Sequence, residues 1–158
     1  MNNKLKSGII AGFVATLVIS TLSLLTVIMG LIPPLDTVLL LSSALAVPVL
    51  VGWMIHFVIG AMLWGFGFGA FYTHLPGRSM AAKGTSLGVV VWLLMGLIVM
   101  PMAGVGLMGL DNGLMTPFLS LILHLIFGLV LGTSFVRIYS ELSSIQLSSA
   151  SSSTLYHR

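Results

Sequence analysis

Four long stretches without a charged side chain constrain the fold of this chain more than any other feature. They lie between Lys6 and Asp36, Asp36 and Arg78, Lys83 and Asp111, and Asp111 and Arg137. Each is long enough to hold a transmembrane helix, which needs about 20 residues. Lipid offers no hydrogen-bond partner to the backbone, so an apolar stretch crosses a membrane as a helix. The sequence therefore predicts an all-α, polytopic membrane protein with four transmembrane helices.

Proline and glycine set the predicted helix boundaries. Pro33-Pro34 ends the first helix, because proline lacks an N–H and disfavours a helical residue before it. Pro48 suits the first turn of the second helix, and Pro76-Gly77 predicts the turn after it. Short connections favour an up-down bundle. The predicted helices comprise residues 8–32, 48–72, 83–106 and 116–139.

A further, shorter helix is predicted at residues 37–46. Asp36 precedes it in the position of an N-cap. The segment is too short to cross a bilayer, so we expect an interfacial or re-entrant helix there.

The chain holds one membrane domain, residues 1–139, and a tail. Residues 140–158 are rich in serine and low in complexity, and we expect them to be disordered. Of all residues, 58% are hydrophobic and only 6% are charged, which leaves no room for a soluble domain.

The basic residues predict the orientation. They are Lys4, Lys6, Arg78, Lys83, Arg137 and Arg158, and all of them fall on one side of the predicted bundle. Asp36 and Asp111 fall on the other side. The positive-inside rule makes the basic side cytoplasmic, together with both termini and the serine-rich tail.

Composition also excludes several functions. The absence of cysteine rules out disulfides, thiolate metal sites and cysteine nucleophiles. A net charge of +3 arises from very few charges and does not indicate nucleic acid. No Ser-His-Asp set has credible geometry on these helices, so we favour a role that is not enzymatic.

Two histidines deep inside apolar stretches are the candidate functional residues. His56 lies four residues before Gly60, and His124 lies four residues before Gly128. A spacing of four places each pair on one helical face. Small residues mark faces where helices approach closely in lipid, so both histidines are predicted to point into the bundle. An ionisable side chain at membrane depth is costly, which makes it a functional-site hypothesis.

A weak internal repeat relates the two halves of the chain. Gly8 and Gly12 match Gly84 and Gly88, and His56-xxx-Gly60 matches His124-xxx-Gly128. Both halves have the same predicted orientation, as in a parallel duplication.

Several segments carry a resemblance to a known family. They run from Gly52 through His56 and Gly60 to Gly65, and include Leu75-Pro76-Gly77, Trp92 to Met95, Met100 to Gly104 and the surroundings of His124. Together they resemble a family of small, uncharacterised bacterial four-helix membrane proteins. The resemblance extends from about residue 6 to residue 139. It implies the four-helix architecture and a place in the bacterial inner membrane, and it implies no activity.

One hypothesis treats the histidines as a ligand pair. The second and fourth helices are diagonal in an up-down bundle, and their imidazoles would meet near its centre. His56 and His124 would then be axial ligands of a b-type haem, or bind a metal ion, as in cytochrome b-type bundles by fold-level analogy. Gly60, Gly96 and Gly128 would leave space for the cofactor or for helix packing. The role would be electron transfer within or beside a respiratory chain.

The other hypothesis is structural. Each histidine would bond to a neighbouring helix, His56 for example to Ser20, Ser23 or Thr26. The protein would then be a non-catalytic membrane subunit or scaffold, and its partner would be the lipid bilayer with another membrane protein or a respiratory complex.

Overall fold

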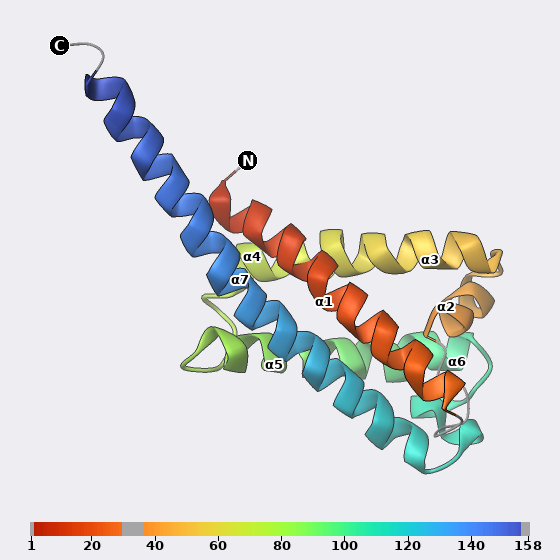
Figure 1. The fold of residues 1–158 in the computed structure, drawn as a ribbon. Coiled ribbons are helices and arrows are strands. Elements are labelled where there is room, and N and C mark those ends of the chain that lie inside the picture. The colour runs from red at the N-terminus through yellow and green to blue at the C-terminus, as the bar shows by residue number, and fades with distance from the viewer. Residues whose placement is uncertain (1, 30–36, 156–158) are drawn as a thin grey trace.

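The computed structural model describes residues 2–29 and 37–155, and this part of the chain is helical with no strand. Within these residues, four helices are long and apolar enough to cross a membrane. We number them as spans one to four: Asn3–Ile28, Val49–Phe71, Met80–Met102 and Met115–Ser149. The predicted all-α membrane fold is confirmed (Figure 1).

The spans are built from the following elements. Span one is α1 (Asn3–Ile28); span two joins α3 (Val49–Val58), η1 (Ile59–Gly65) and α4 (Phe66–Phe71); span three joins α5 (Met80–Leu94), η2 (Met95–Val99) and α6 (Met100–Met102); span four belongs to α7 (Met115–Leu155). Both η1 and η2 are π-helical. The connection between spans one and two carries α2 (Thr37–Leu45), and the connection between spans three and four carries the 3-10 helix η3 (Leu107–Asn112). The predicted stop at Pro33-Pro34 and the predicted cap at Asp36 lie outside the described residues.

The expectation of a disordered tail is wrong for residues 140–155, because α7 continues through them to Leu155. The serine hydroxyls there bond to carbonyls three or four residues earlier, as Ser143 does to Tyr139 at 2.8 Å. Such bonds let serine remain in a helix despite its preference for caps and turns. Asn3 also donates to Gln146 Oε1 at 2.8 Å, which ties the start of α1 to this extension.

Spans one and four form the centre of the bundle. They pack on each other, span two packs on α1, and span three packs on α7 (Figure 1). Glycines make the contacts close in both halves: a methyl group on Gly12 would overlap the backbone of span two, and one on Gly84 would overlap Gly128. Spans two and three, by contrast, do not pack tightly on each other.

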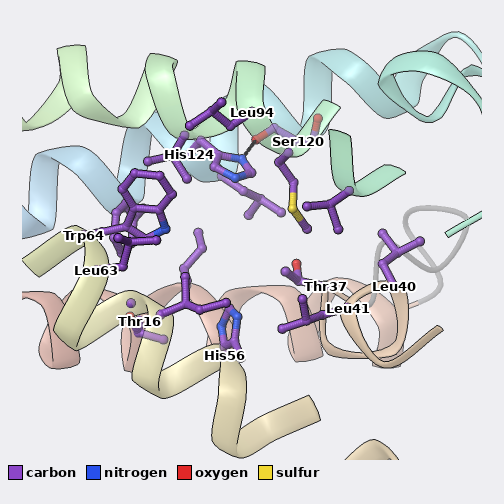
Figure 2. Close-up of a pocket in the computed structure, with 18 of the residues that line it drawn as sticks. Thr16, Thr37, Leu40, Leu41, His56, Leu63, Trp64, Leu94, Ser120 and His124 are labelled. Carbon is purple, nitrogen blue, oxygen red and sulfur yellow. Dashed lines mark hydrogen bonds between the residues drawn. The ribbon is translucent and has the colours of Figure 1, made fainter. Parts of the chain in front are cut away.

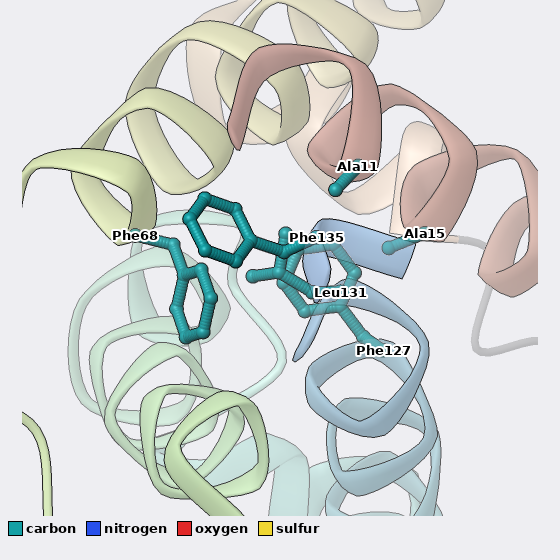
Figure 3. Packing of buried hydrophobic residues seen from close by; sticks show 6 residues of the cluster. All are labelled: Ala11, Ala15, Phe68, Phe127, Leu131 and Phe135. Carbon is teal, nitrogen blue, oxygen red and sulfur yellow. The ribbon is translucent and has the colours of Figure 1, made fainter. Parts of the chain in front are cut away.

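The main hydrophobic core lies where α1, α4 and α7 meet. It consists of Ala11, Ala15, Phe68, Phe127, Leu131 and Phe135 (Figure 3). The Phe68 and Phe135 rings meet edge to face, with centroids 5.2 Å apart. This cluster fills the half of the bundle nearer the N-terminus, so the space between spans two and three remains only in the other half.

The short helix α2 covers the opposite end of the bundle. It contacts α3, α6 and η2, and its Leu40 packs against the buried Met100. Leu39 on its other face is 47% exposed. The predicted short helix is therefore present, with its buried face on the mouth of the bundle.

Candidate functional site

A cavity of about 340 Å³ lies in the half of the bundle that the aromatic core leaves open. All four spans and α2 contribute to its wall. Most of its lining is apolar; the polar exceptions are Thr16, Thr37, His56, Trp64, Ser120 and His124 (Figure 2). Ligand sites in helix bundles have this character, with few polar groups on an apolar wall. Its volume lies at the lower end of the usual range of about 300–1,000 Å³.

Both predicted histidines line this one cavity. His56 comes from α3 and His124 from α7, and they lie on opposite walls (Figure 2). The sequence argument that placed them on inward faces thus brings them to one site. Their immediate bonding differs, and that difference decides what each can do.

His56 is tied to span one. Its Nε2 lies 3.1 Å from Ser20 Oγ, and Ser20 donates its own proton to the Thr16 carbonyl at 2.7 Å. A serine hydroxyl has a single proton, so in this arrangement Ser20 accepts and His56 Nε2 donates. The bond to Ser20 is one of those that the structural hypothesis predicted. It occupies Nε2, one of the two ring nitrogens through which a histidine can bind a metal or haem iron.

His124 is held by its own helix. Its Nδ1 lies 2.7 Å from the Ser120 carbonyl oxygen, which can only accept, so Nδ1 carries a proton. In the neutral ring Nε2 then keeps its lone pair, and the described part of the chain supplies no hydrogen bond to it. A donated Nδ1 proton is also what orients histidine ligands in metal sites. His124 therefore presents one acceptor nitrogen at the cavity.

Span three fixes the turn of α7 that carries His124. Trp92 Nε1 donates to Ser120 Oγ at 3.0 Å, and Ser120 Oγ donates to the Pro117 carbonyl at 3.0 Å. The residue whose carbonyl orients His124 is thus itself bonded across the helix interface. This network holds the imidazole in position.

Both π-helical segments lie at the cavity. Ile59, Gly60, Leu63 and Trp64 of η1 line it, and so do Met95, Ile98 and Val99 of η2. A π-helix bonds each residue to the fifth one along, which widens the turn, and such segments often occur at functional sites. The two spans that do not pack on each other are the two that contain a π segment.

The three predicted site glycines take different positions. Gly60 lines the cavity and packs closely on Thr16. Gly96 faces the Met108 side chain, and Gly128 faces the backbone of Gly84. Gly96 and Gly128 do not line the cavity, and both lie at close helix or loop contacts.

No cluster of three or more His, Cys, Asp or Glu side chains that could hold a metal occurs within residues 2–29 and 37–155. The polar side chains of the cavity wall are the two histidines, Trp64 and the hydroxyl residues Thr16, Thr37 and Ser120.

Sequence reasoning missed the cavity's position and both π segments. One signal of η1 is present in the sequence: Gly60 and Gly65 are five residues apart, and both face α1. That spacing matches a π turn and not an α turn. Nothing comparable marks η2, since the buried residue Gly96 packs on Met108 of η3 and not on another span.

The fold and its site define a multi-pass α-helical membrane protein with a cavity between its spans. Residues 2–145 match the model of a family described as a family of unknown function, DUF6789. The chain belongs to that family, as the resemblance in its sequence implied. No curated protein and no solved structure matches it.

Proposed function

We propose that this protein binds a small, largely apolar molecule inside the membrane, with His124 as its polar anchor. The observation that carries this proposal is a single cavity lined by all four spans, both π segments and both histidines. Most of its wall is apolar, so burial of apolar ligand surface supplies the greater part of the affinity.

The acceptor nitrogen of His124 favours a ligand with a hydroxyl or another hydrogen-bond donor. Burying a hydrogen-bond donor against an apolar wall without a partner costs free energy. The Nε2 acceptor of His124 removes that cost, so the site selects ligands that carry a donor. His56 donates from Nε2 to Ser20 and stabilises the opposite wall. The ligand class is thus a compact apolar molecule carrying one hydrogen-bond donor.

The second candidate is the haem or metal site formed by His56 and His124. It is favoured by the position of both residues on one cavity. Against it, His56 Nε2 is engaged by Ser20, and a haem is larger than the small ligands that a cavity of about 340 Å³ accepts. Haem binding would require that bond to break and spans two and three to separate further.

Binding can be tested through Trp64, which lines the cavity. Purified protein is titrated with 4-bromophenol, whose heavy atom quenches tryptophan fluorescence, and with bromobenzene, which lacks the hydroxyl. We expect saturable quenching, with 4-bromophenol about ten-fold tighter because one hydrogen bond contributes about 1.4 kcal/mol. Replacing His124 with leucine should remove that preference.

Two adjacent residues of α7 provide a matched control. Leu123 lines the cavity, whereas Ile122 is 51% exposed on the outer face. Leu123→Phe should abolish saturable quenching and Ile122→Phe should leave it intact. Equal quenching of both variants would show that the probe partitions nonspecifically and would overturn the proposal.

A visible absorption spectrum of protein made with haem available tests the second candidate, haem binding by His56 and His124. If neither the apolar probes nor haem bind, both binding proposals fail and the scaffold role predicted from the sequence is favoured.

A further inference from the structure

Two lysines from different helices converge on one tyrosine ring at the end of the bundle where the N-terminus lies. Lys4 is in the first turn of α1, and Lys83 is in the first turn of α5. Each ammonium nitrogen lies 5.7 Å from the centroid of the Tyr72 ring, at the end of α4. Lys83 Nζ also donates to the Tyr72 carbonyl at 2.9 Å. Three helices therefore bring two positive charges to one place.

These two charges have no counter-ion among the residues that the structure describes. Within the described residues neither ammonium group lies within 4.0 Å of a carboxylate. Glu141 on α7 is exposed. Lys4 and Lys83 are half-buried, unlike the exposed Lys6 and Arg78, so bulk water screens them less well. Contact with an aromatic face offsets part of the repulsion between them, but it adds no negative charge.

The pair lies at the ends of the apolar stretches, where a transmembrane bundle is expected to meet the lipid headgroups. The apolar stretch of span one begins at Gly8, one helical turn after Lys4, and span two ends at Phe71, next to Tyr72. Basic pockets between transmembrane helices at this level bind anionic headgroups. The positive-inside rule places this end of the bundle in the leaflet that is rich in anionic lipid.

We propose that Lys4 and Lys83, with Tyr72 as the wall between them, bind the phosphate of an anionic lipid headgroup. Each ammonium group donates to phosphate oxygens, and Lys83 keeps one proton for the Tyr72 carbonyl. The bound lipid bridges α1, α4 and α5, which belong to both halves of the chain. This site is separate from the cavity and does not depend on its ligand.

The test uses the full chain in a neutral detergent, titrated with short-chain phosphatidylglycerol, short-chain phosphatidylcholine or inorganic phosphate. Affinity is read from the rise in melting temperature. A lysine near an anionic headgroup contributes about 1 kcal/mol, or about five-fold in affinity. The double variant Lys4→Gln/Lys83→Gln should therefore bind phosphatidylglycerol roughly 25-fold more weakly than the wild type.

The matched control is Lys6→Gln/Arg78→Gln, which removes the same charge from exposed positions at the same end. It should change the affinity less than two-fold. Lys83→Arg should retain binding, which separates loss of charge from misfolding. An equal loss of affinity in the control variant would show that the lipid responds to the overall positive charge of this end, and would overturn the proposed site. Equal affinity for phosphatidylglycerol and phosphatidylcholine would also overturn it, and so would inorganic phosphate as effective as the lipid, since the ligand would then be a free anion.

Discussion

Two histidines that look equivalent in the sequence have different bonding in the structure. His56 bonds across a helix interface to Ser20, whereas His124 bonds within its own helix to the Ser120 carbonyl. The position of both side chains could be predicted, because an apolar run with a glycine four residues on identifies the inward face. Their bonding could not, since it depends on which neighbouring helix carries a hydroxyl at the same depth.

Removing the Ser20 hydroxyl tests the role of His56. Ser20→Ala should lower the free energy of unfolding by about 1 kcal/mol, because interhelical hydrogen bonds in membranes contribute about 0.6–2 kcal/mol. Thr21→Ala is the control, since Thr21 is exposed and bonds to the Leu17 carbonyl of its own helix. Unfolding in mixed detergent micelles at increasing denaturing-detergent fraction measures both. If the two variants lose the same stability, the His56–Ser20 bond does not hold the helices together.

At the scale of the elements, the π turn of η1 decides which glycines of span two face α1. An α-helical spacing predicts a stripe through Gly60 and Gly67. In the structure Gly65 packs on Gly8 and Gly12, while a methyl group on Gly67 would meet nothing within 4 Å. The extra residue in a π turn shifts all later residues of the span to a different face of the helix. A glycine stripe predicted at 3.6 residues per turn is therefore wrong beyond that turn. Span four has no such turn, and Ser120, Gly128 and Gly132, which follow the α-helical spacing around His124, are all buried.

This difference predicts opposite results for two alanine substitutions two residues apart. Gly65→Ala should be strongly destabilising, by several kcal/mol, because the new methyl group overlaps the Gly8 carbonyl and neither backbone can move without separating the helices. Gly67→Ala should raise the free energy of unfolding by up to about 1 kcal/mol through helix propensity. Melting temperatures of the two purified variants provide the comparison. A neutral Gly65→Ala would contradict the packing of α1 on η1.

At the scale of the whole molecule, the four-helix count and the all-α class followed from charge-free stretches alone. The extent of α7 did not, because serine-rich sequence is read as disorder unless its hydroxyls are known to bond to the helix backbone. The path of the chain places Asn112 in η3, at the end of the bundle opposite the N-terminus (Figure 1).

Reporter fusions test the orientation that the basic residues predict. A reporter joined after Arg158 should be active only if it works in the cytoplasm, and one inserted beside Asn112 only if it works outside. The physical reason is that translocation of short basic segments is disfavoured, which keeps Lys4, Arg78 and Lys83 inside. Activity of both fusions in the same compartment would be incompatible with four crossings.

The two π segments limit the symmetry of the predicted internal repeat. In the internal repeat, span two corresponds to span four and span three to span one. A symmetric repeat would give a π segment in span two a counterpart in α7, and one in span three a counterpart in α1. Both α1 and α7 are regular α-helices instead. The two π segments thus lie at positions that do not correspond in the predicted repeat, and both face the same cavity. Close glycine contacts occur in both halves, at Gly12 and at Gly84, whereas the walls of the cavity do not follow the predicted repeat.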